Sequence, residues 1–405
     1  MISTKKPEPE QEHKPDLRIA HISTVRFPSA ETDTEQAART IDALWNEGAR
    51  IDMIVPKTQR LQQDTPEAAF RKFYNIACGF RVHTYPSVPA LPLEADRIIS
   101  AAIAGIKYRN QYDIIHTRSR GVVILSVLLQ QPVIFETYRD LQKTAPVFSR
   151  LLKLLSSSSY FLGAICHSKL SANALKAAGI EPDKVAVVYN GFDPSLLQPV
   201  LSTKTARTMV GLPHHQNLVV YAGNVQHTKG ISILLDLAKD LPDVQFMIVG
   251  GQPRHLKTLK AEISARNIGN IKLAGWKNHI ELGPYLYAAD ILIIPPTSGP
   301  LEKFGRTVLP MKTFLFLGVG RTILAPATAD ISEILEHDVD ALLTPPDDRK
   351  AAAAAIRLTL SDTSLSNRLA KNALKKSRDF SWRKRARKIR QLYQNWLERV
   401  YDHAD

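Results

Sequence analysis

Short apolar stretches alternate with longer amphipathic stretches along most of the chain. The short ones are rich in Ile and Val and are apolar at successive positions, which is typical of parallel strands that helices cover on both faces. In the first half, strands are expected at Leu17–Ser23, Arg50–Pro56, Tyr112–Thr117, Pro132–Thr137, Phe161–His167 and Val185–Tyr189. In the second half, strands are expected at Asn217–Ala222, Val244–Val249, Ile271–Ala274, Asp290–Ile294, Thr322–Ala325 and Ala341–Leu343.

Helical periodicity fills the segments between these strands. Glu35–Glu47 runs into Gly48, and Ser168–Ala178 starts with a capping serine and is followed by Gly179, which are typical helix boundaries. In the second half, helices are expected at Ile231–Lys239, Leu256–Arg266, Pro284–Ala289, Lys312–Leu317 and Lys350–Leu360. Each half repeats the same alternation, which predicts an α/β protein with two doubly wound, Rossmann-like domains.

The domain limits follow from breaks in this alternation. Residues 1–16 are rich in Pro, Lys and Glu and are expected to form a disordered tail. The first domain is expected at 17–200 and the second at 201–381, with the joint in the polar stretch near Pro199–Thr208. Ligands of open parallel sheets bind beyond the carboxyl ends of the strands, so we expect the two domains to face one another across a cleft.

The last segment, 382–405, is expected to be an amphipathic helix. Its apolar residues recur at spacings of three and four, and its basic residues lie largely off this stripe. The stripe consists of Trp382, Ala386, Ile389, Tyr393, Trp396, Leu397 and Val400. Six Lys and Arg residues and no acid occur between Arg383 and Arg390. This run is either a solvated helix face or a contact for acidic lipid.

The composition is that of an ordinary globular protein, because 44% of the 405 residues are hydrophobic and 23% are charged. No apolar run approaches the roughly 20 residues of a membrane-spanning helix, and the N-terminal segment lacks the apolar core of a signal peptide. Two cysteines, Cys78 and Cys166, cannot build a disulfide framework, so a reducing cytoplasm is expected. The formal net charge of +14 favours anionic partners, such as nucleotides, nucleic acid or acidic lipid.

Several segments carry a family signature in their order and spacing. In the second half they are YAGNVQHTKGISILLDLAKDLPDVQFMIVGG, GWKNHIELGPYLYAADILIIPP, LPMKTFLFLGVGRTILAP and DISEILEHDVDALLTPPDD. In the first half they are YDIIHTRS, AICHSKLSANALKAAGI and VAVVYNGFDP, and DFSWRKRARKIRQLY lies near the end. Together they resemble the retaining glycosyltransferases of family 4, which have the GT-B fold. The resemblance implies a C-terminal helix that crosses back onto the first domain, and sugar transfer with retention and without a protein nucleophile.

The loop Gly223–Gly230 follows an expected strand and opens a helix, so its backbone N–H groups can bind an anion. Lys229 adds a positive charge suited to phosphate. On its own, the loop is equally well an ordinary connection between a strand and a helix. The resemblance implies that Lys229 contacts the donor diphosphate and that Lys312, which begins a helix after Pro310, contacts it as well. Arg306 is expected to converge on the same helix start.

Some positions depart from the family pattern. Asn224 stands where the family usually has Arg, which removes a charge. The paired glutamates of the family fall at Thr307 and Leu315 in one register and at Glu302 and Pro310 in the other, so the pair is incomplete in both. Glu302 is expected to act as the remaining catalytic carboxylate. The expected donor-binding residues are Gly223, Asn224, Lys229, Gly230, Arg306, Thr307 and Lys312.

Polar residues also follow the expected strands of the first domain. Tyr138 stands where the family often has His, so its hydroxyl is expected to touch the sugar at the catalytic centre. The alternative is a partly buried tyrosine with a satisfied hydroxyl. Arg26 and Thr34 are expected on the acceptor side, although their loop lacks the Gly-rich turn of the family. His116 lies in an apolar strand and is expected to be a core histidine rather than a ligand.

These observations favour a glycosyltransferase that moves a sugar from a nucleotide-sugar to a hydroxyl of a glycan or lipid-linked acceptor, in the synthesis of cell-surface polysaccharide or glycolipid. The incomplete glutamate pair keeps a second hypothesis open, a non-catalytic GT-B protein that binds a nucleotide or glycan. No cofactor or metal ion is expected, because no cluster of metal ligands stands at a strand end. Nucleic acid is disfavoured, because no aromatic residues are interleaved with the basic run. A cytoplasmic location is expected, with an anionic membrane surface as a further partner.

Overall fold

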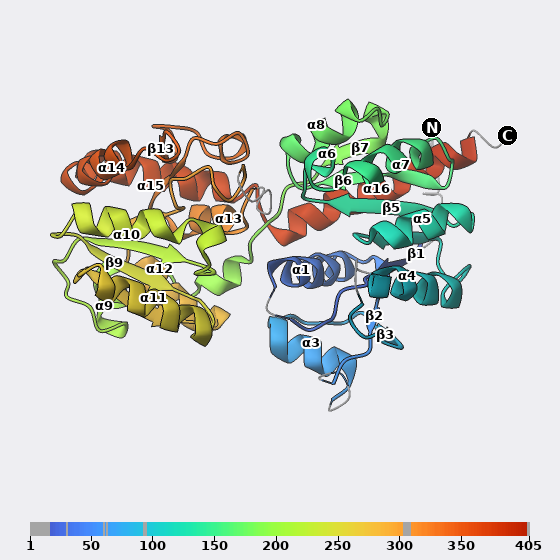
Figure 1. The fold of residues 1–405 in the computed structure, drawn as a ribbon, viewed down its shortest axis with the longest axis horizontal. Helices are drawn as coiled ribbons and strands as arrows, with labels where there is room; N and C mark the ends of the chain where they lie inside the picture. Colours follow the sequence, from blue (N-terminus) through green and yellow to red (C-terminus); the bar gives the residue numbers. More distant parts are fainter. Residues whose placement is uncertain are drawn as a thin grey trace, which may run out of the picture.

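The computed structural model describes residues 17–29, 31–59, 61, 64–91, 95–302 and 309–402. These residues form two α/β domains, each with a parallel sheet between layers of helices (Figure 1). The predicted fold class is therefore confirmed. The tail expected at 1–16 lies outside the described residues. Within the described part of the chain, no helix is both long enough and apolar enough to cross a bilayer.

The first domain is built on seven parallel strands in the order β3-β2-β1-β4-β5-β6-β7. The strands are β1 (Arg18–Ile22), β2 (Arg50–Pro56), β3 (Val82–Tyr85), β4 (Ile114–Thr117), β5 (Val133–Thr137), β6 (Phe161–Cys166) and β7 (Val185–Val187). The helices are α1 (Thr32–Asn46), α3 (Pro66–Tyr74), α4 (Ala95–Lys107), α5 (Arg120–Leu128), α6 (Leu141–Thr144), α7 (Pro146–Ser156) and α8 (Lys169–Ala177). The strand order reverses between β1 and β4, which opens a crevice at their carboxyl ends.

The second domain repeats this design with six parallel strands in the order β10-β9-β8-β11-β12-β13. The strands are β8 (Leu218–Ala222), β9 (Gln245–Val249), β10 (Ile271–Gly275), β11 (Ile291–Ile293), β12 (Thr322–Pro326) and β13 (Leu342–Thr344). The helices are α9 (Thr203–Met209), α10 (Ile231–Asp240), α11 (Pro253–Ala265), α12 (His279–Tyr287), α13 (Lys312–Val319), α14 (Arg349–Ser361) and α15 (Thr363–Ser377). Here the order reverses between β8 and β11.

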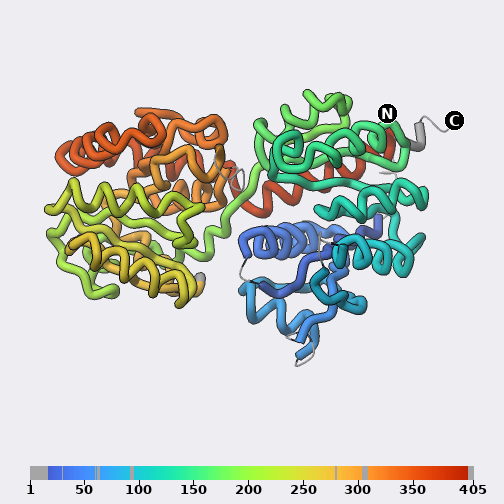
Figure 2. The backbone as a smooth tube through the Cα atoms, in the orientation of Figure 1, coloured from blue at the N-terminus to red at the C-terminus, as the bar shows by residue number. Residues whose placement is uncertain are grey.

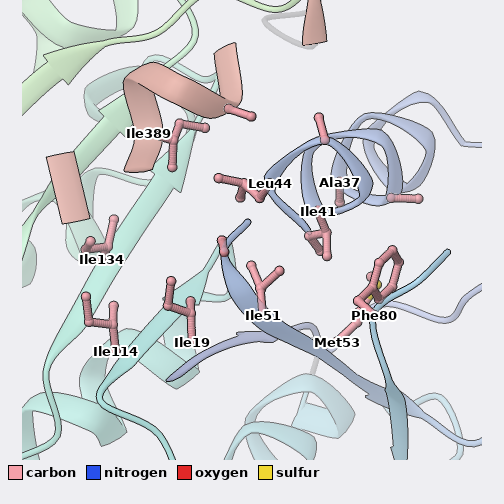
Figure 3. Close-up of a cluster of buried hydrophobic side chains, with 14 of the residues drawn as sticks. Ile19, Ala37, Ile41, Leu44, Ile51, Met53, Phe80, Ile114, Ile134 and Ile389 are labelled. Carbon is pink, nitrogen blue, oxygen red and sulfur yellow. The ribbon is translucent and has the colours of Figure 1, made fainter. Parts of the chain in front are cut away.

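The last helix, α16 (Trp382–Asp402), packs against α1 and belongs to the core of the first domain (Figures 1 and 2). Figure 3 shows Leu44 of α1 and Ile389 of α16 near each other above the apolar side chains of the sheet. The stripe of apolar residues that the sequence placed on this helix therefore has its partner surface. The crossing of the C-terminal helix onto the first domain is confirmed.

The chain passes between the domains twice. Phe192 and Leu197 already pack in the core of the second domain. The first passage therefore precedes the stretch Pro199–Thr208, where the polar pattern predicted the joint, because two apolar residues upstream of that stretch are anchored in the second core. The return lies between Phe380, which packs on the second core, and Trp382, which is buried in the first.

A carboxylate of the second domain also holds the two domains together. Glu333 accepts hydrogen bonds from the backbone N–H groups of Lys169 and Leu170, at 2.6 and 2.8 Å. These two residues form the first turn of α8, where the helix dipole favours a negative charge. The contact links the two domains beside the cleft described next.

Candidate active site

A cleft of about 900 Å³ lies between the two domains, at the carboxyl ends of both sheets. The first domain contributes Gln36, Arg118, Tyr138, Arg139, His167 and Asn190 to its wall. The second domain contributes Gly223, Asn224, Lys229, Lys312, Leu315 and Asp330. The expected cleft is therefore present, and several residues that the sequence singled out meet in it.

The loop after β8 has a conformation that only glycine tolerates at its first position. Gly223 has a φ of 145°, and a Cβ there would lie 2.8 Å from the Nζ atom of Lys312. Tyr221 donates a hydrogen bond to the backbone oxygen of Asn224 at 2.6 Å, and the side-chain oxygen of Asn224 accepts one from the N–H of Gln226 at 3.2 Å. The loop therefore has a fixed shape that brings its backbone close to Lys312.

The same loop ends in a short helical turn that leads directly into α10. Lys229 is the last residue of this turn, and Gly230, with a φ of 79°, is the N-cap of α10. A Cβ at Gly230 would lie 2.5 Å from the methyl group of Thr297. Glycine is thus required at both ends of the loop, and the N-terminus of α10 opens beside the cleft, where it favours an anion.

Lys312 begins α13 and extends its ammonium group under the loop. Its Nζ atom lies 3.8 Å from the centre of the Tyr221 ring, a cation–π contact. Among the described residues, no carboxylate forms an ion pair with it. Burial lowers the pKa of Lys312 well below its usual value, and the nearby charge of Lys229 lowers this pKa further. The two lysines together form a positively charged pocket that an anion would stabilise.

This depressed pKa predicts that anion binding takes up protons. A bound diphosphate favours the charged ammonium, so the pKa of Lys312 rises on binding. Affinity is then greatest below the pKa of the free protein and falls as the pH rises through the interval up to the pKa of the complex. Calorimetric titrations of UDP in two buffers with different ionisation enthalpies should show proton uptake by the wild type. The Lys312→Met variant should lack this component, and equal uptake by both proteins would contradict the assignment.

The turn that precedes α13 is held by a buried carboxylate. The Oδ2 atom of Asp330 accepts a hydrogen bond from the N–H of Leu309 at 2.7 Å, and its Oδ1 accepts one from the hydroxyl of Thr328 at 2.7 Å. Leu309 has a φ of 47°, a conformation that is costly for leucine. Asp330 therefore fixes the backbone that presents Lys312 to the cleft.

The remaining donor-side predictions have different outcomes. Arg306 and Thr307 lie outside the described residues. Leu315 lines the cleft, so an apolar side chain stands where the family pattern has a carboxylate. The exposed side chain of Glu302 is not among those that line the cleft, although its neighbour Leu301 is. The structure therefore gives Glu302 no contact with the site.

On the first domain, Tyr138 lies at the cleft as predicted from its position after β5. Its ring stacks on His167 with ring centres 5.9 Å apart, and its hydroxyl accepts a hydrogen bond from Arg139 at 3.1 Å. Gln36 of α1 also lines the cleft. Its amide nitrogen donates to Asn190 at 2.9 Å, and its buried amide oxygen has no hydrogen-bond partner in the described structure. That oxygen can accept a hydrogen bond from a ligand hydroxyl.

A buried carboxylate beneath this wall was not predicted. Glu136 of β5 is 1% exposed, and Arg118, Arg385, His116 and His167 surround it. Burial acts to raise the pKa of Glu136, but the charges of Arg118 and Arg385 outweigh it and hold that pKa well below its usual value. A single acid in the apolar strand segment was the available sequence signal, because a buried charge requires partners.

His167 is a cleft residue that the sequence did not single out. Its Nε2 atom lies 2.5 Å from a carboxylate oxygen of Glu136. Burial lowers the pKa of His167 to about 3, even though the carboxylate acts to raise it. The imidazole is therefore neutral near pH 7, and it supports the ring of Tyr138 without adding charge.

Three first-domain residues do not line the cleft. His116 is fully buried and its Nδ1 atom lies 2.7 Å from the Tyr393 hydroxyl, in agreement with its prediction as a core histidine. Thr34 is buried, with its hydroxyl bound to the carbonyl groups of Ser29 and Glu31. Arg26 is exposed and points toward the carbonyl group of Val88, at 3.5 Å. The acceptor-side prediction for Arg26 and Thr34 has no support, because Thr34 is buried in the first turn of α1 and Arg26 points toward Val88.

Within the described ranges, the His, Cys, Asp and Glu side chains form no group of three or more that could hold a metal ion. On the donor side of the cleft, Lys229 and Lys312 both line the wall and supply positive charge.

Comparison with known families matches both halves of the chain. Residues 35–196 match Glycosyltransferase Family 4, and residues 202–376 match Glycosyl transferases group 1. A D-inositol 3-phosphate glycosyltransferase of a Nocardioides species is 25% identical over 232 residues, which are 53% of this chain and 49% of that protein. The chain thus spans about half the length of this curated relative.

Solved structures show the same fold over nearly the whole chain. HepE of Anabaena, solved in complex with UDP, has a TM-score of 0.73 and 19% identity, and the match covers 94% of this chain and 100% of that chain. Sucrose-phosphate synthase of Thermosynechococcus elongatus has a TM-score of 0.75 and 20% identity, over 94% of this chain and 98% of that chain. At these identities, both matches show that the chain shares the two-domain fold.

Proposed function

The chain belongs to glycosyltransferase family 4, and from this premise we propose that it transfers a sugar from a nucleotide-sugar to an acceptor hydroxyl with retention of the anomeric configuration. The observation that carries the proposal is the convergence of Gly223, Lys229 and Lys312 at the carboxyl end of β8. Burial and the charge of Lys229 lower the pKa of Lys312, and the negative charge of a bound diphosphate would raise it again.

In this mechanism, the second domain holds the donor and stabilises its leaving group. Negative charge develops on the nucleoside diphosphate as the bond to the sugar breaks. Lys229, Lys312 and the helix N-termini beside them lie where they can stabilise that charge. Trp276, 67% exposed and part of the cleft wall, offers a stacking surface for the nucleobase. UDP is the nucleotide to test first, because HepE was solved with it.

The first domain binds the acceptor in this proposal. The unpaired amide oxygen of Gln36 accepts a hydrogen bond from a sugar or acceptor hydroxyl, and Tyr138 offers its own hydroxyl. The acceptor is a glycan or a lipid-linked glycan of cell-surface synthesis. Closing the domains over both substrates excludes water, which would otherwise hydrolyse the donor.

Transfer is expected to proceed without a divalent cation. The reason is that the two lysines supply the positive charge that a metal ion would otherwise place beside the diphosphate. Initial rates should be the same in EDTA and after addition of Mg²⁺ or Mn²⁺. Complete loss of transfer on chelation, with recovery on adding either ion, would contradict this expectation.

The experiment for the function itself is a transfer assay. The wild type is incubated with UDP-, GDP- and ADP-sugars together with membrane and glycan fractions, and release of the nucleoside diphosphate and labelled product are measured. Acceptor-dependent release supports the proposal, and the anomeric configuration of the product tests retention. The apolar Leu315 motivates the second hypothesis, a non-catalytic binding protein. Tight UDP binding without transfer, with transfer gained by Leu315→Glu, would favour that hypothesis.

A further inference from the structure

The outer face of the first domain exposes an unusual number of large apolar side chains. Helices α4, α5 and α7 lie side by side over one face of the sheet (Figure 1). They carry six of the fifteen exposed large hydrophobic residues found among the described residues, with exposed fractions between 42% and 78%. These six are Ile98, Ile99, Ile106, Leu128, Val147 and Leu154. The other nine lie singly on different elements or loops, so this face is distinct.

Helix α4 buries small residues and exposes most of its large apolar ones. Its buried positions are Ser100, Ala101 and Ala104, and Ile103 packs partly against the core. Ile98 and Ile106 lie outside this buried set and are each 65% exposed. A surface helix of a globular protein normally has the reverse arrangement.

The small residues have a packing role that explains this arrangement. A Cβ on Gly105 of α4 would lie 2.5 Å from the side chain of Leu125, and a Cβ on Gly121 would lie 3.0 Å from the Cβ of Ala101. Helices α4 and α5 therefore pack closely: the side chain of Leu125 occupies the space beside Gly105, and Gly121 leaves room for Ala101. The side chains of Ile98 and Ile106 stay 65% exposed beside this contact, so only a surface outside the molecule can bury them further.

Helix α7 continues the same surface. Val147, Leu151 and Leu154 recur at spacings of four and three, which places them on one side of the helix together with Arg150. Val147 and Leu154 are 78% and 72% exposed. The apolar residues thus extend across neighbouring helices, rather than along one helix alone.

The charges around this face are almost all positive. Segments 95–112, 119–131 and 139–160, which contain these helices, hold eight Lys and Arg residues against two Asp and no Glu. Arg97, Arg120 and Arg139 also line the cleft, so one end of the face meets the acceptor side of the site. Exposed aliphatic side chains surrounded by Lys and Arg are complementary to a lipid bilayer, which has an apolar interior and, with anionic lipids, a negatively charged surface.

We propose that the face formed by α4, α5 and α7 docks on the surface of an anionic lipid bilayer. The isoleucine, leucine and valine side chains enter the boundary between headgroups and acyl chains, and the surrounding lysines and arginines contact anionic headgroups. The acceptor side of the cleft then opens next to the bilayer. The orientation of the cleft matters only if the proposed function holds, because the bilayer would then present a lipid-linked acceptor to the cleft. Docking itself does not depend on the proposed function.

The basic run of α16, where the sequence suggested contact with lipid, is largely engaged within the protein. Arg383 and Arg387 both pair with Glu47 at the end of α1, at 2.5 and 2.6 Å. Arg385 is buried against Glu136. These contacts fasten α16 to the first domain, on the face of the sheet opposite α4, α5 and α7. Because these arginines already have partners within the first domain, the proposal places the lipid contact on the face formed by α4, α5 and α7 instead.

The test is co-sedimentation of the full chain with vesicles of equimolar phosphatidylcholine and phosphatidylglycerol, and with vesicles of phosphatidylcholine alone. The apolar variant is Ile98→Gln/Ile106→Gln/Leu154→Gln. The matched control, Val200→Gln/Met209→Gln/Leu358→Gln, removes equally exposed apolar residues from other surfaces. A charge variant, Arg109→Gln/Arg150→Gln/Lys153→Gln, leaves the cleft untouched. The circular dichroism spectrum and thermal unfolding of each protein show whether it is folded.

The wild type and the matched control should bind the anionic vesicles, and the apolar variant should bind at least about tenfold more weakly. The charge variant should lose the preference for anionic vesicles. Equal binding by the apolar variant and the control would overturn the proposal. A second outcome would also overturn it: the wild type binds no vesicles but self-associates, and the apolar substitutions abolish that self-association. The partner of this face would then be a second copy of the chain. Vesicle binding without transfer from any of the UDP-, GDP- and ADP-sugars would count against the proposed function and leave this inference standing.

Discussion

Replacing Arg385 by Met is expected to lower the free energy of unfolding by about 3–5 kcal/mol, the cost of breaking a buried ion pair on one side. Arg385 and Glu136 are each 1% exposed in their ion pair. The guanidinium group also donates hydrogen bonds to the carbonyl groups of Val188 and Tyr189, in the segment that leads toward the second domain. Methionine fills similar space, but the buried carboxylate of Glu136 then lacks its ion pair with residue 385.

Denaturation by urea, followed by tryptophan fluorescence, measures this effect. The matched control is Arg383→Met, which removes an arginine from the same helix, where the side chain is 71% exposed and pairs with Glu47. That control should change the free energy of unfolding by less than about 1 kcal/mol. The double variant Glu136→Gln/Arg385→Met should recover part of the loss, because the unpaired charge is gone. Equal, small effects of Arg385→Met and Arg383→Met would show that the buried pair is not needed.

The ion pair of Glu136 and Arg385 also makes the free energy of unfolding depend on pH in a predictable direction. The pKa of Glu136 is lower in the folded protein than in the unfolded chain. Its stabilising contribution is therefore fully present above the unfolded-state pKa of a glutamate and is lost as the pH falls toward the folded-state pKa. In Arg385→Met that pKa rises, so this part of the acid sensitivity should diminish.

The second large effect is expected on donor binding. Lys229→Ala and Lys312→Ala should each weaken the binding of UDP by about ten- to a hundredfold, because each removes a charge-assisted contact worth roughly 1.5–3 kcal/mol. Lys312→Ala should show the larger loss, because the side chain of Lys312 fills the space beside Gly223. Isothermal titration measures both.

Lys239→Ala is the matched control for these variants. Lys239 is exposed in the last turn of α10, the helix whose N-terminus opens at the cleft. Its removal changes the net charge equally but should leave the affinity for UDP unchanged. Unchanged affinity in both site variants would refute the donor-site assignment. A loss of the same size in Lys239→Ala would show that only the overall charge of the protein matters.

The fold was predictable because its signals are local and repeated. Apolar runs such as Phe161–His167 and glycine stops such as Gly179 recur along both halves, and each is a short-range pattern. The first passage between the domains was misplaced because Phe192 and Leu197 are isolated apolar residues. Only their tertiary contacts show which core they join.

The donor side of the cleft was more predictable than the acceptor side, for a physical reason. The loop Gly223–Gly230 is one continuous stretch whose glycines and lysine serve a single purpose, so its pattern is visible in the chain. The wall of the first domain is assembled from Gln36, Tyr138 and His167, which are far apart in the sequence. Arg385, which supports that wall, comes from the last helix. No local spacing connects such residues, and only the fold brings them together.

A crystal structure of the wild-type protein with UDP bound tests the donor site most directly. The diphosphate is expected against the backbone of Gly223, within hydrogen-bonding distance of the Nζ atoms of both Lys229 and Lys312, with the nucleobase extending toward Trp276. A nucleotide bound elsewhere, or bound in the cleft with neither lysine in contact with a phosphate, would contradict this expectation.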